Sequence, residues 1–299
     1  MKIDHNFNIT NVSHILDHAD ALTKEYDESS KCKEFILEKI NSNQTKTFTF
    51  IDENNTILGL GVIELLDVNY GNLILHTIEA DHEAYFAHFI AKEGLITNNI
   101  LELIQFRNSF SYRDEFIRMG YREKERVRMI HKNIASFKGI QAEENTSFKE
   151  ITENDCETCG TISYHSHKHR INIECYDVYS SIEKRTKFCL DLRNKKHGKS
   201  IDPACLLLNY KDIPVGVIDI THVTNLETDI GWIMDISLLP DYQGMGLGKH
   251  LLEYALGKLN ETGYEQAGLG VTLSNKNAHE LYKKIGFEEY DFFVEIIAR

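Results

Sequence analysis

The chain has 299 residues and is acidic, with 46 carboxylates against 33 Lys and Arg and a formal net charge of −13. This balance argues against nucleic acid as a partner, because phosphate binding needs clustered positive charge. No segment has the apolar length of a membrane span and residues 1–5 lack the apolar core of a signal peptide, so we expect a cytoplasmic protein with no membrane partner.

The first half of the chain alternates helical and strand patterns. Apolar periodicity predicts, in chain order, helices over 12–24 and 30–41, strands over 47–51, 56–66 and 73–78, a helix over 84–93, a strand over 101–106, a helix over 112–119 and a strand over 126–131. A polar stretch near 136–147 follows. The length suits two domains, and we predict them at 1–135 and 146–299.

The second half repeats the alternation. The patterns predict a helix over 151–163, a hairpin of strands 206–208 and 215–220, a strand over 230–238, a helix over 247–260, a strand over 268–273, a helix over 277–284 and a strand over 290–298. Thr152 or Asn154 is the expected cap of the first of these helices. The order predicts an α+β layered fold with mixed sheets.

A glycine-rich turn, residues 243–248, lies between the strand over 230–238 and the helix that follows. Such a turn leaves N–H groups bare at the start of a helix, where the helix dipole favours a phosphate-bearing ligand. The glycines at 244, 246 and 248 do not have the spacing of a dinucleotide fingerprint, and His250 follows Gly248-Lys249 where a P-loop requires Ser or Thr.

Gln243, Gly246 and Gly248 instead match Gln/Arg-x-x-Gly-x-Gly/Ala, the pyrophosphate-binding signature of the GNAT superfamily of acyl-CoA-dependent N-acetyltransferases. About 30 residues later the sequence resembles the other acyl-CoA-binding motif of that family, Asn275-x-x-Ala278-x-x-Leu281-Tyr282-x-x-x-Gly286-Phe287. The resemblance runs from about residue 206 to the C-terminus. Taken one at a time, these residues are more typical of turns and helix caps, so the recognition depends on their joint spacing.

The resemblance implies transfer of an acetyl group from acetyl-CoA to a primary amine, with no metal. It places the contacts to acetyl-CoA at Ile236, Ser237, Leu238, Gln243, Gly244, Met245, Gly246, Leu247, Gly248, Lys249, Asn275 and Tyr282. The strand end over 236–238 would pair with the pantetheine arm as an added strand does, and the turn would hold the diphosphate.

The position of Tyr282 implies a general acid that protonates the departing thiolate. For the general base, Asp235 is the first candidate, with Glu227 and Asp229 as runners-up. Strand alternation is expected to place Asp235 on one face with Ile233 and Ser237. A solvated or paired carboxylate, with water as the base, is the alternative.

The first half echoes the second. Residues 61–64 resemble 216–219, and Phe116-x-x-x-Gly120 answers Tyr282-x-x-x-Gly286. Glu79 and Asp81 lie where the glycine turn should be, and their carboxylates would repel a diphosphate. We therefore predict two GNAT-like domains, the first a degenerate copy that walls the substrate cleft; an unrelated α+β domain is the alternative.

Two further features leave alternatives open. Cys156-x-x-Cys159 with His165, His167 and His169 has ligands for zinc, but packing positions on the helix over 151–163 are the preferred interpretation. Tyr and His over 161–200 indicate a polar acceptor, either a small-molecule amine or a peptide. A non-catalytic acyl-CoA-binding regulatory module, another acyl group and an oxygen acceptor remain alternatives, as do a monomer and a homodimer.

Overall fold

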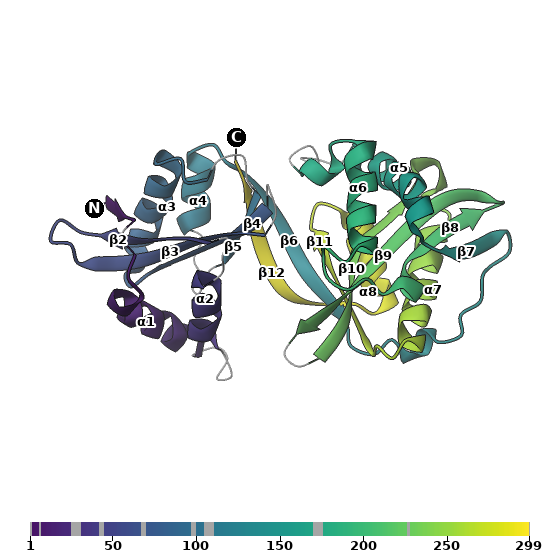
Figure 1. Ribbon diagram of the computed structural model, residues 1–299, viewed down its shortest axis with the longest axis horizontal. Helices are drawn as coiled ribbons and strands as arrows, with labels where there is room; N and C mark the ends of the chain where they lie inside the picture. The colour runs from purple at the N-terminus through teal and green to yellow at the C-terminus, as the bar shows by residue number, and fades with distance from the viewer. Residues whose placement is uncertain are drawn as a thin grey trace. The chain divides into compact units, whose positions relative to one another are not determined.

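The computed structural model describes residues 2–5, 7–24, 31–41, 45–66, 70–96, 100–104, 111–169, 176–225 and 228–298. The chain forms two compact units (Figure 1). Unit 1 contains residues 1–125 together with 293–299, and unit 2 contains residues 126–292. The chain therefore passes between the units twice. We expected a boundary about ten residues later, and we did not expect the C-terminal end to belong to unit 1.

Unit 1 consists of a mixed sheet with helices on both faces. Its elements are β1 (Lys2–Asp4), α1 (Ser13–Lys24), α2 (Cys32–Ile40), β2 (Thr45–Ile51), β3 (Ile57–Leu65), β4 (Tyr70–Thr77), α3 (Glu83–Lys92), β5 (Ile100–Ile104), α4 (Ser111–Arg118) and the start of β6 (Arg122–His131). The strands pair in the order β1-β2-β3-β4-β5, antiparallel except for β4–β5. One apolar cluster holds α1 and α2 against the sheet, and a second holds α3 and α4.

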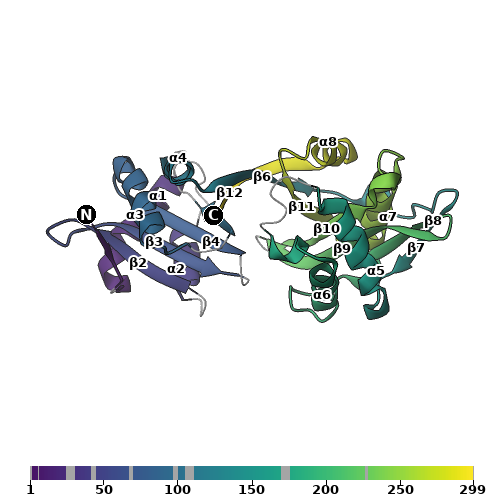
Figure 2. The same ribbon diagram turned by 90° about the horizontal axis from the view of Figure 1, so that it is seen from above.

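Unit 2 repeats this plan. Its elements are β7 (Thr146–Glu150), α5 (Cys156–His167), α6 (Ile182–Arg193), β8 (Leu206–Tyr210), β9 (Ile213–Asn225), β10 (Thr228–Leu238), α7 (Leu247–Glu261), β11 (Gln266–Thr272), α8 (Lys276–Ile285) and β12 (Glu288–Ile297). The strands pair in the order β7-β8-β9-β10-β11, again antiparallel except for the last pair. Helices α5 and α6 cover one face of this sheet and α7 covers the other (Figure 2). The mixed, mostly antiparallel sheets and flanking helices confirm the predicted fold class.

The two halves exchange their final strands. The C-terminal end of β12 pairs antiparallel with β5, so that Val294 lies opposite Leu103 in unit 1. The end of β6 pairs antiparallel with β11, so that Arg128 lies opposite Gly270 in unit 2. Each sheet is thus extended by the last strand of the other half of the chain. Hydrophobic periodicity reveals where a strand forms but not which neighbour it pairs with.

The apolar stripe of α7 explains how the sequence builds the part of unit 2 that carries the glycine turn. Leu247, Leu251, Leu252, Ala255, Leu256 and Leu259 recur at helical spacing and are all buried. They belong to the main apolar cluster of unit 2, which also contains Tyr282 of α8. The helix is therefore fixed along its length, and its first turn is held against the end of β10.

Candidate functional site

The glycine turn forms an open cradle at the start of α7. Gly244 and Gly246 have left-handed backbone angles, with φ of +79° and +83°, which favour glycine. A Cβ added at either position would meet no atom within 4 Å, so the space above the turn is open. The side chain of Gln243 links the turn to the end of β10, because its Nε2 donates a hydrogen bond to the Leu238 carbonyl at 3.0 Å.

The backbone donors of this turn are not used by the protein. Over the described residues 228–298, the N–H groups of residues 244–249 donate to no other group of the chain, and the first helical bond runs from the His250 N–H to the Gly246 carbonyl at 3.1 Å. The Lys249 ammonium is engaged with Glu253 at 2.7 Å. The turn can therefore bind an anion through backbone N–H groups and the helix dipole, with Lys249 nearby.

Strand β10 leaves part of its edge unpaired next to this turn. It pairs with β11 only over residues 230–233, whereas its pairing with β9 continues to Leu238. The two parallel strands diverge beyond that point, so the edge of residues 234–238 that faces β11 has no ladder partner among the described residues. Such an edge can accept an extended, amide-containing chain as an additional strand. It contains Ile236, Ser237 and Leu238, three of the residues that the sequence predicted.

A β-bulge lies where the two strands diverge. The register of β10 against β9 shifts between Ile233 and Asp235, which makes Met234 the extra residue. The bulge changes the alternation of side chains: a Cβ at Gly231 would meet Leu259 of α7, whereas Asp235 contacts Ser163 of α5. The expected grouping of Asp235 with Ile233 on one face is therefore wrong, because simple alternation does not allow for an inserted residue.

Asp235 is buried in a polar network on the α5 and α6 face. Its carboxylate accepts hydrogen bonds from Ser163 Oγ at 2.6 Å, Ser237 Oγ at 2.8 Å and Arg185 Nη2 at 2.6 Å, and His167 Nε2 lies 4.0 Å away. Burial alone would raise the pKa of Asp235, but Arg185, His167 and the two hydroxyl groups hold it below its usual value. A carboxylate so engaged is a poor proton acceptor, so these surroundings argue against Asp235 as the general base.

Asp229 and Glu227 are the other two candidates for the general base. Asp229 is largely exposed, accepts a hydrogen bond from Thr224 Oγ1 at 3.1 Å and lies 3.7 Å from His222 Nε2. It lies five residues before the bulge, in the part of β10 that is paired with β9. Glu227 lies outside the described residues.

The second motif forms α8 and its two ends. Tyr282 is buried, with 7% of its surface exposed, and its ring centre lies 6.0 Å from that of Phe287. Gly286 ends the helix with φ of +110°, and its N–H donates to the Tyr282 carbonyl at 3.2 Å. Asn275 is the N-cap, but its side chain makes no capping bond; its N–H instead donates to the Thr272 carbonyl.

Three residues of the buried network were not anticipated from the sequence: Ser163, His167 and Arg185. A signal was present for Arg185, because it occupies the buried stripe of α6 together with Cys189 and Leu192, at helical spacing. An arginine on such a stripe needs a buried carboxylate as its partner. Nothing in the spacing identifies which carboxylate that is.

Two of the residues considered for zinc, Cys156 and His167, make other contacts. Cys156 and Cys159 are both buried, and the Cys156 thiol donates to the Thr152 carbonyl at 3.6 Å. His167 belongs to the Asp235 network. Over the described residues, no three or more His, Cys, Asp or Glu side chains are grouped so as to hold a metal ion. Also within the described part of the chain, no helix is both long and apolar enough to cross a membrane.

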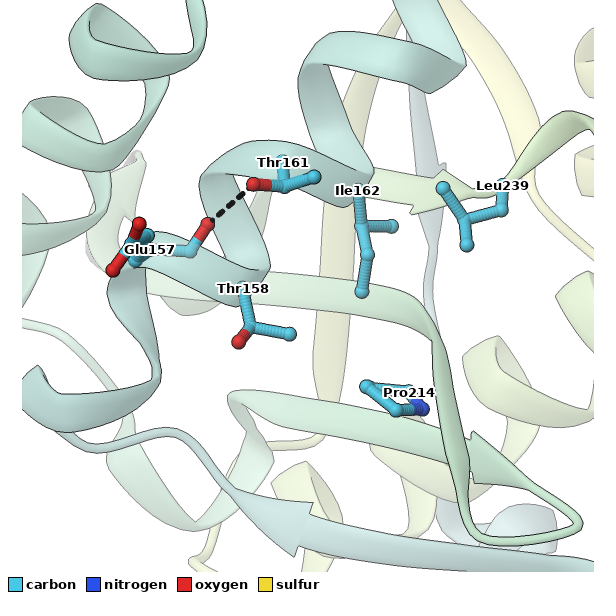
Figure 3. Close-up of a pocket in the computed structure, with 6 residues that line it drawn as sticks. All are labelled: Glu157, Thr158, Thr161, Ile162, Pro214 and Leu239. Atoms are coloured by element: carbon cyan, nitrogen blue, oxygen red, sulfur yellow. Dashed lines mark hydrogen bonds between the residues drawn. The ribbon is translucent and has the colours of Figure 1, made fainter.

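A cavity of about 310 Å³ lies on the α5 face near the end of β10 (Figure 3). Its lining consists of Glu157, Thr158, Thr161, Ile162, Pro214 and Leu239. The Thr161 hydroxyl donates to the Glu157 carbonyl at 2.9 Å (Figure 3). None of the residues predicted for the site lines this cavity, although Leu239 directly follows Leu238 in the chain.

Comparison with known proteins identifies the domain that contains the turn. The model of the acetyltransferase (GNAT) family matches residues 151–287. This segment belongs to the GNAT family. The match contains both motifs and the strand β10, so the turn and the unpaired edge described above are parts of a GNAT domain.

Curated relatives match the GNAT domain over shorter segments. The [ribosomal protein bS18]-alanine N-acetyltransferase of Escherichia coli K12 is 34% identical over 82 residues, which are 27% of this chain and 55% of that protein. The mycothiol acetyltransferase of Thermomonospora curvata is 35% identical over 101 residues, 33% of each chain. The matched segments thus span about half, or less, of these relatives.

Solved structures extend the comparison to both units. A GCN5-related N-acetyltransferase from Sphaerobacter thermophilus has a TM-score of 0.61 at 13% identity, covering 96% of this chain and 90% of its own. A tandem GNAT protein from the clavulanic acid biosynthesis pathway has a TM-score of 0.52 at 12% identity, covering 99% and 98%. At these identities the likeness concerns the fold alone.

Proposed function

We propose that this protein transfers an acetyl group from acetyl-CoA to the primary amine of a small polar molecule or a peptide. The proposal depends on two features that lie next to each other: the free N–H groups at residues 244–249 and the unpaired edge of β10 at residues 234–238. A diphosphate and an amide-containing arm, joined in one ligand, suit these two adjacent features. GNAT membership of residues 151–287 supports the same ligand.

The residues present fit acetyl-CoA chemically. The open space above Gly244 and Gly246 leaves room for phosphate oxygens close to the backbone. Bound acetyl-CoA supplies an acyl thioester. Backbone N–H groups of the β10 edge, near Ile236, would stabilise the carbonyl oxygen as charge develops on it, an effect commonly of about 3 kcal/mol for one donor.

The acceptor nitrogen loses two protons as it bonds to the acyl carbon, and the sulfur gains one as the carbon–sulfur bond breaks. The acceptor ammonium, with a pKa near 10.4 for an alkylamine, loses the first proton before it attacks. Because Asp235 is buried and already bound to Arg185, we propose that water accepts this proton. We assign Tyr282 as the group that donates a proton to the sulfur, and the second proton from the nitrogen restores the Tyr282 hydroxyl.

The acceptor class is proposed from chemistry and relatives together. The acidic chain favours the approach of cationic amines. One relative is named as acting on an alanine of ribosomal protein bS18, which favours a peptide acceptor among the amines. We propose further that unit 1 is a degenerate GNAT-like copy. Its strand order matches that of unit 2, but a short helical turn over Ala80–His82, without glycine, replaces the cradle.

The proposal is tested by measuring coenzyme A release from acetyl-CoA with a panel of amino acids, polyamines, amino sugars and short peptides. Release that depends on one class of amine would support the transfer and name the acceptor. Binding of acetyl-CoA without release for any amine would instead favour a regulatory module.

A further inference from the structure

Helix α6 presents two arginines to two buried carboxylates. Arg185 binds Asp235 of β10, with Nη2 to Oδ2 at 2.6 Å, and Arg193 binds Asp219 of β9. The side chains of both pairs are at most 6% exposed. Asp235 and Asp219 lie directly opposite each other in the β9–β10 ladder. The two pairs therefore have the same chemistry, start from the same helix and end on neighbouring strands.

The two ion pairs differ in how the strand that carries the carboxylate is paired with its neighbours. Strand β9 carries no inserted residue next to Asp219: it is paired with β8 over residues 213–218, bridged to Ser200 at Thr221 and paired with β10 over residues 216–225, so it has neighbours along both edges on either side of Asp219. Asp235 is the first residue after the bulge at Met234, where β10 leaves β11. The Asp235 pair is thus anchored at the C-terminal end of β10, where the strand is no longer paired with β11.

The Asp235 pair is itself held rigidly. The Arg185 guanidinium lies 4.4 Å from the ring centre of Tyr179 and 4.7 Å from that of Phe188. Ser163 of α5 and Ser237 of β10 donate to the carboxylate from two further sides. One carboxylate therefore joins α5, α6 and the part of β10 that follows the bulge.

Stability alone does not account for such a pair. A buried ion pair contributes little more than two well-packed apolar residues, because desolvation offsets the attraction, whereas it does specify one conformation in some proteins. The carboxylate accepts a hydrogen bond from Ser237, one of the edge residues that the proposed function places next to the thioester.

We propose that Asp235 and Arg185 are a positioning pair that holds the bulge of β10 and thereby aims the free backbone groups of residues 236–238 at the thioester. The inference rests on the proposed function for its catalytic consequence, but not for its structural one. In this role Asp235 accepts no proton from the acceptor amine.

The test compares two neutral double variants, Asp235→Asn with Arg185→Met, and Asp219→Asn with Arg193→Met. Each removes both charges of one pair, so that neither leaves a buried charge unpaired. Turnover is measured at saturating substrates from pH 6 to 9, acetyl-CoA binding by thermal shift, and, without ligand, hydrogen exchange of the Leu239 amide, which donates to the Val215 carbonyl at 2.9 Å. The single variant Asp235→Asn is measured beside them as a check on the charge alone.

We expect the Asp235/Arg185 double variant to lose turnover roughly 10²-fold, as for the loss of one oxyanion donor. The turnover of the variant divided by that of the natural protein should be the same at every pH, and exchange of the Leu239 amide should rise at least tenfold. The Asp219/Arg193 variant should keep turnover and exchange within a few-fold.

Three results would overturn the proposal. The first is a loss of turnover in the Asp235/Arg185 variant that becomes smaller as the pH rises, which would make Asp235 a proton acceptor. The others are natural turnover in that variant, or equal losses of turnover in both double variants. If the natural protein shows no transfer with any amine, the proposed function fails separately. Hydrogen exchange then still decides the positioning role, which unchanged protection of the Leu239 amide would refute.

Discussion

The indole of Trp232 lies against Gly268, its partner across the parallel β10–β11 ladder. A Cβ at Gly268 would come within 2.6 Å of the indole ring, closer than side chains approach one another. The two residues stand at the end of the paired segment, just before the strands diverge. The size of residue 268 therefore controls how closely β10 and β11 approach at the beginning of the unpaired edge.

Gly268→Ala is expected to destabilise unit 2 by about 1–3 kcal/mol, because the added methyl group overpacks the indole. Urea unfolding followed by tryptophan fluorescence measures this directly, since Trp232 is the single tryptophan of the chain. Gly270→Ala is the matched control: its Cβ would meet the flexible end of Arg126 at 3.3 Å, so the loss should be smaller. Equal losses would mean that the indole does not set the spacing.

Asp219→Asn should change how stability depends on pH. Burial raises the pKa of Asp219 to about 6, from 3.8, in spite of the attraction of Arg193. The folded state then binds a proton more readily than the unfolded state, so this group favours folding below pH 4 and loses that contribution as the pH rises through 6. The melting temperature of the natural protein relative to the variant should fall over this interval.

Melting curves from pH 4 to 7 in matched buffers provide that comparison. A melting temperature of the natural protein that rises relative to the variant as the pH increases would contradict the prediction. Asp235 has the opposite sign. Its lowered pKa contributes stability that is present above pH 3.8 and is lost as the pH falls further.

Tyr282→Phe is expected to lower turnover roughly 10²- to 10⁴-fold, the usual contribution of a general acid, while acetyl-CoA binding is retained. The ring is buried beside Phe287, so the variant keeps the packing and loses only the hydroxyl group. Tyr254→Phe is the control, since Tyr254 stacks on Phe148 at 3.8 Å, away from the predicted site residues. Steady-state kinetics and thermal shift separate the two effects. Unaltered turnover in Tyr282→Phe would remove its assigned role.

Local periodicity predicted most of the fold. The helix expected over 247–260 is α7 (Leu247–Glu261), and the strand expected over 230–238 is β10 (Thr228–Leu238). These predictions are confirmed because an apolar stripe and its glycine and proline boundaries are local properties of the chain. The polar strand β7 (Thr146–Glu150) was missed, since its side chains are exposed or half-buried and give no alternating pattern.

Features that depend on distant partners were not predictable. The bulge at Met234 appears only when β10 is matched to β9, and the pairing of Asp235 with Arg185 joins residues 50 positions apart. The exchange of final strands depends on packing between elements far apart in sequence. By contrast, the open backbone at Gly244 and Gly246 was predictable, because glycine spacing before a helix is a local signal.

The most direct test of the account is a thermal-shift titration with acetyl-CoA of the natural protein, Gly246→Glu and Gly263→Glu. Gly263 is the matched control, because it also has a positive φ and open space around its Cα but lies at the other end of α7. At one hundred times its dissociation constant, acetyl-CoA should stabilise the natural protein and Gly263→Glu by about 2.7 kcal/mol. Gly246→Glu should show no gain, since the carboxylate would occupy and repel the diphosphate position. Equal stabilisation of all three proteins, or of none, would contradict binding at residues 244–249.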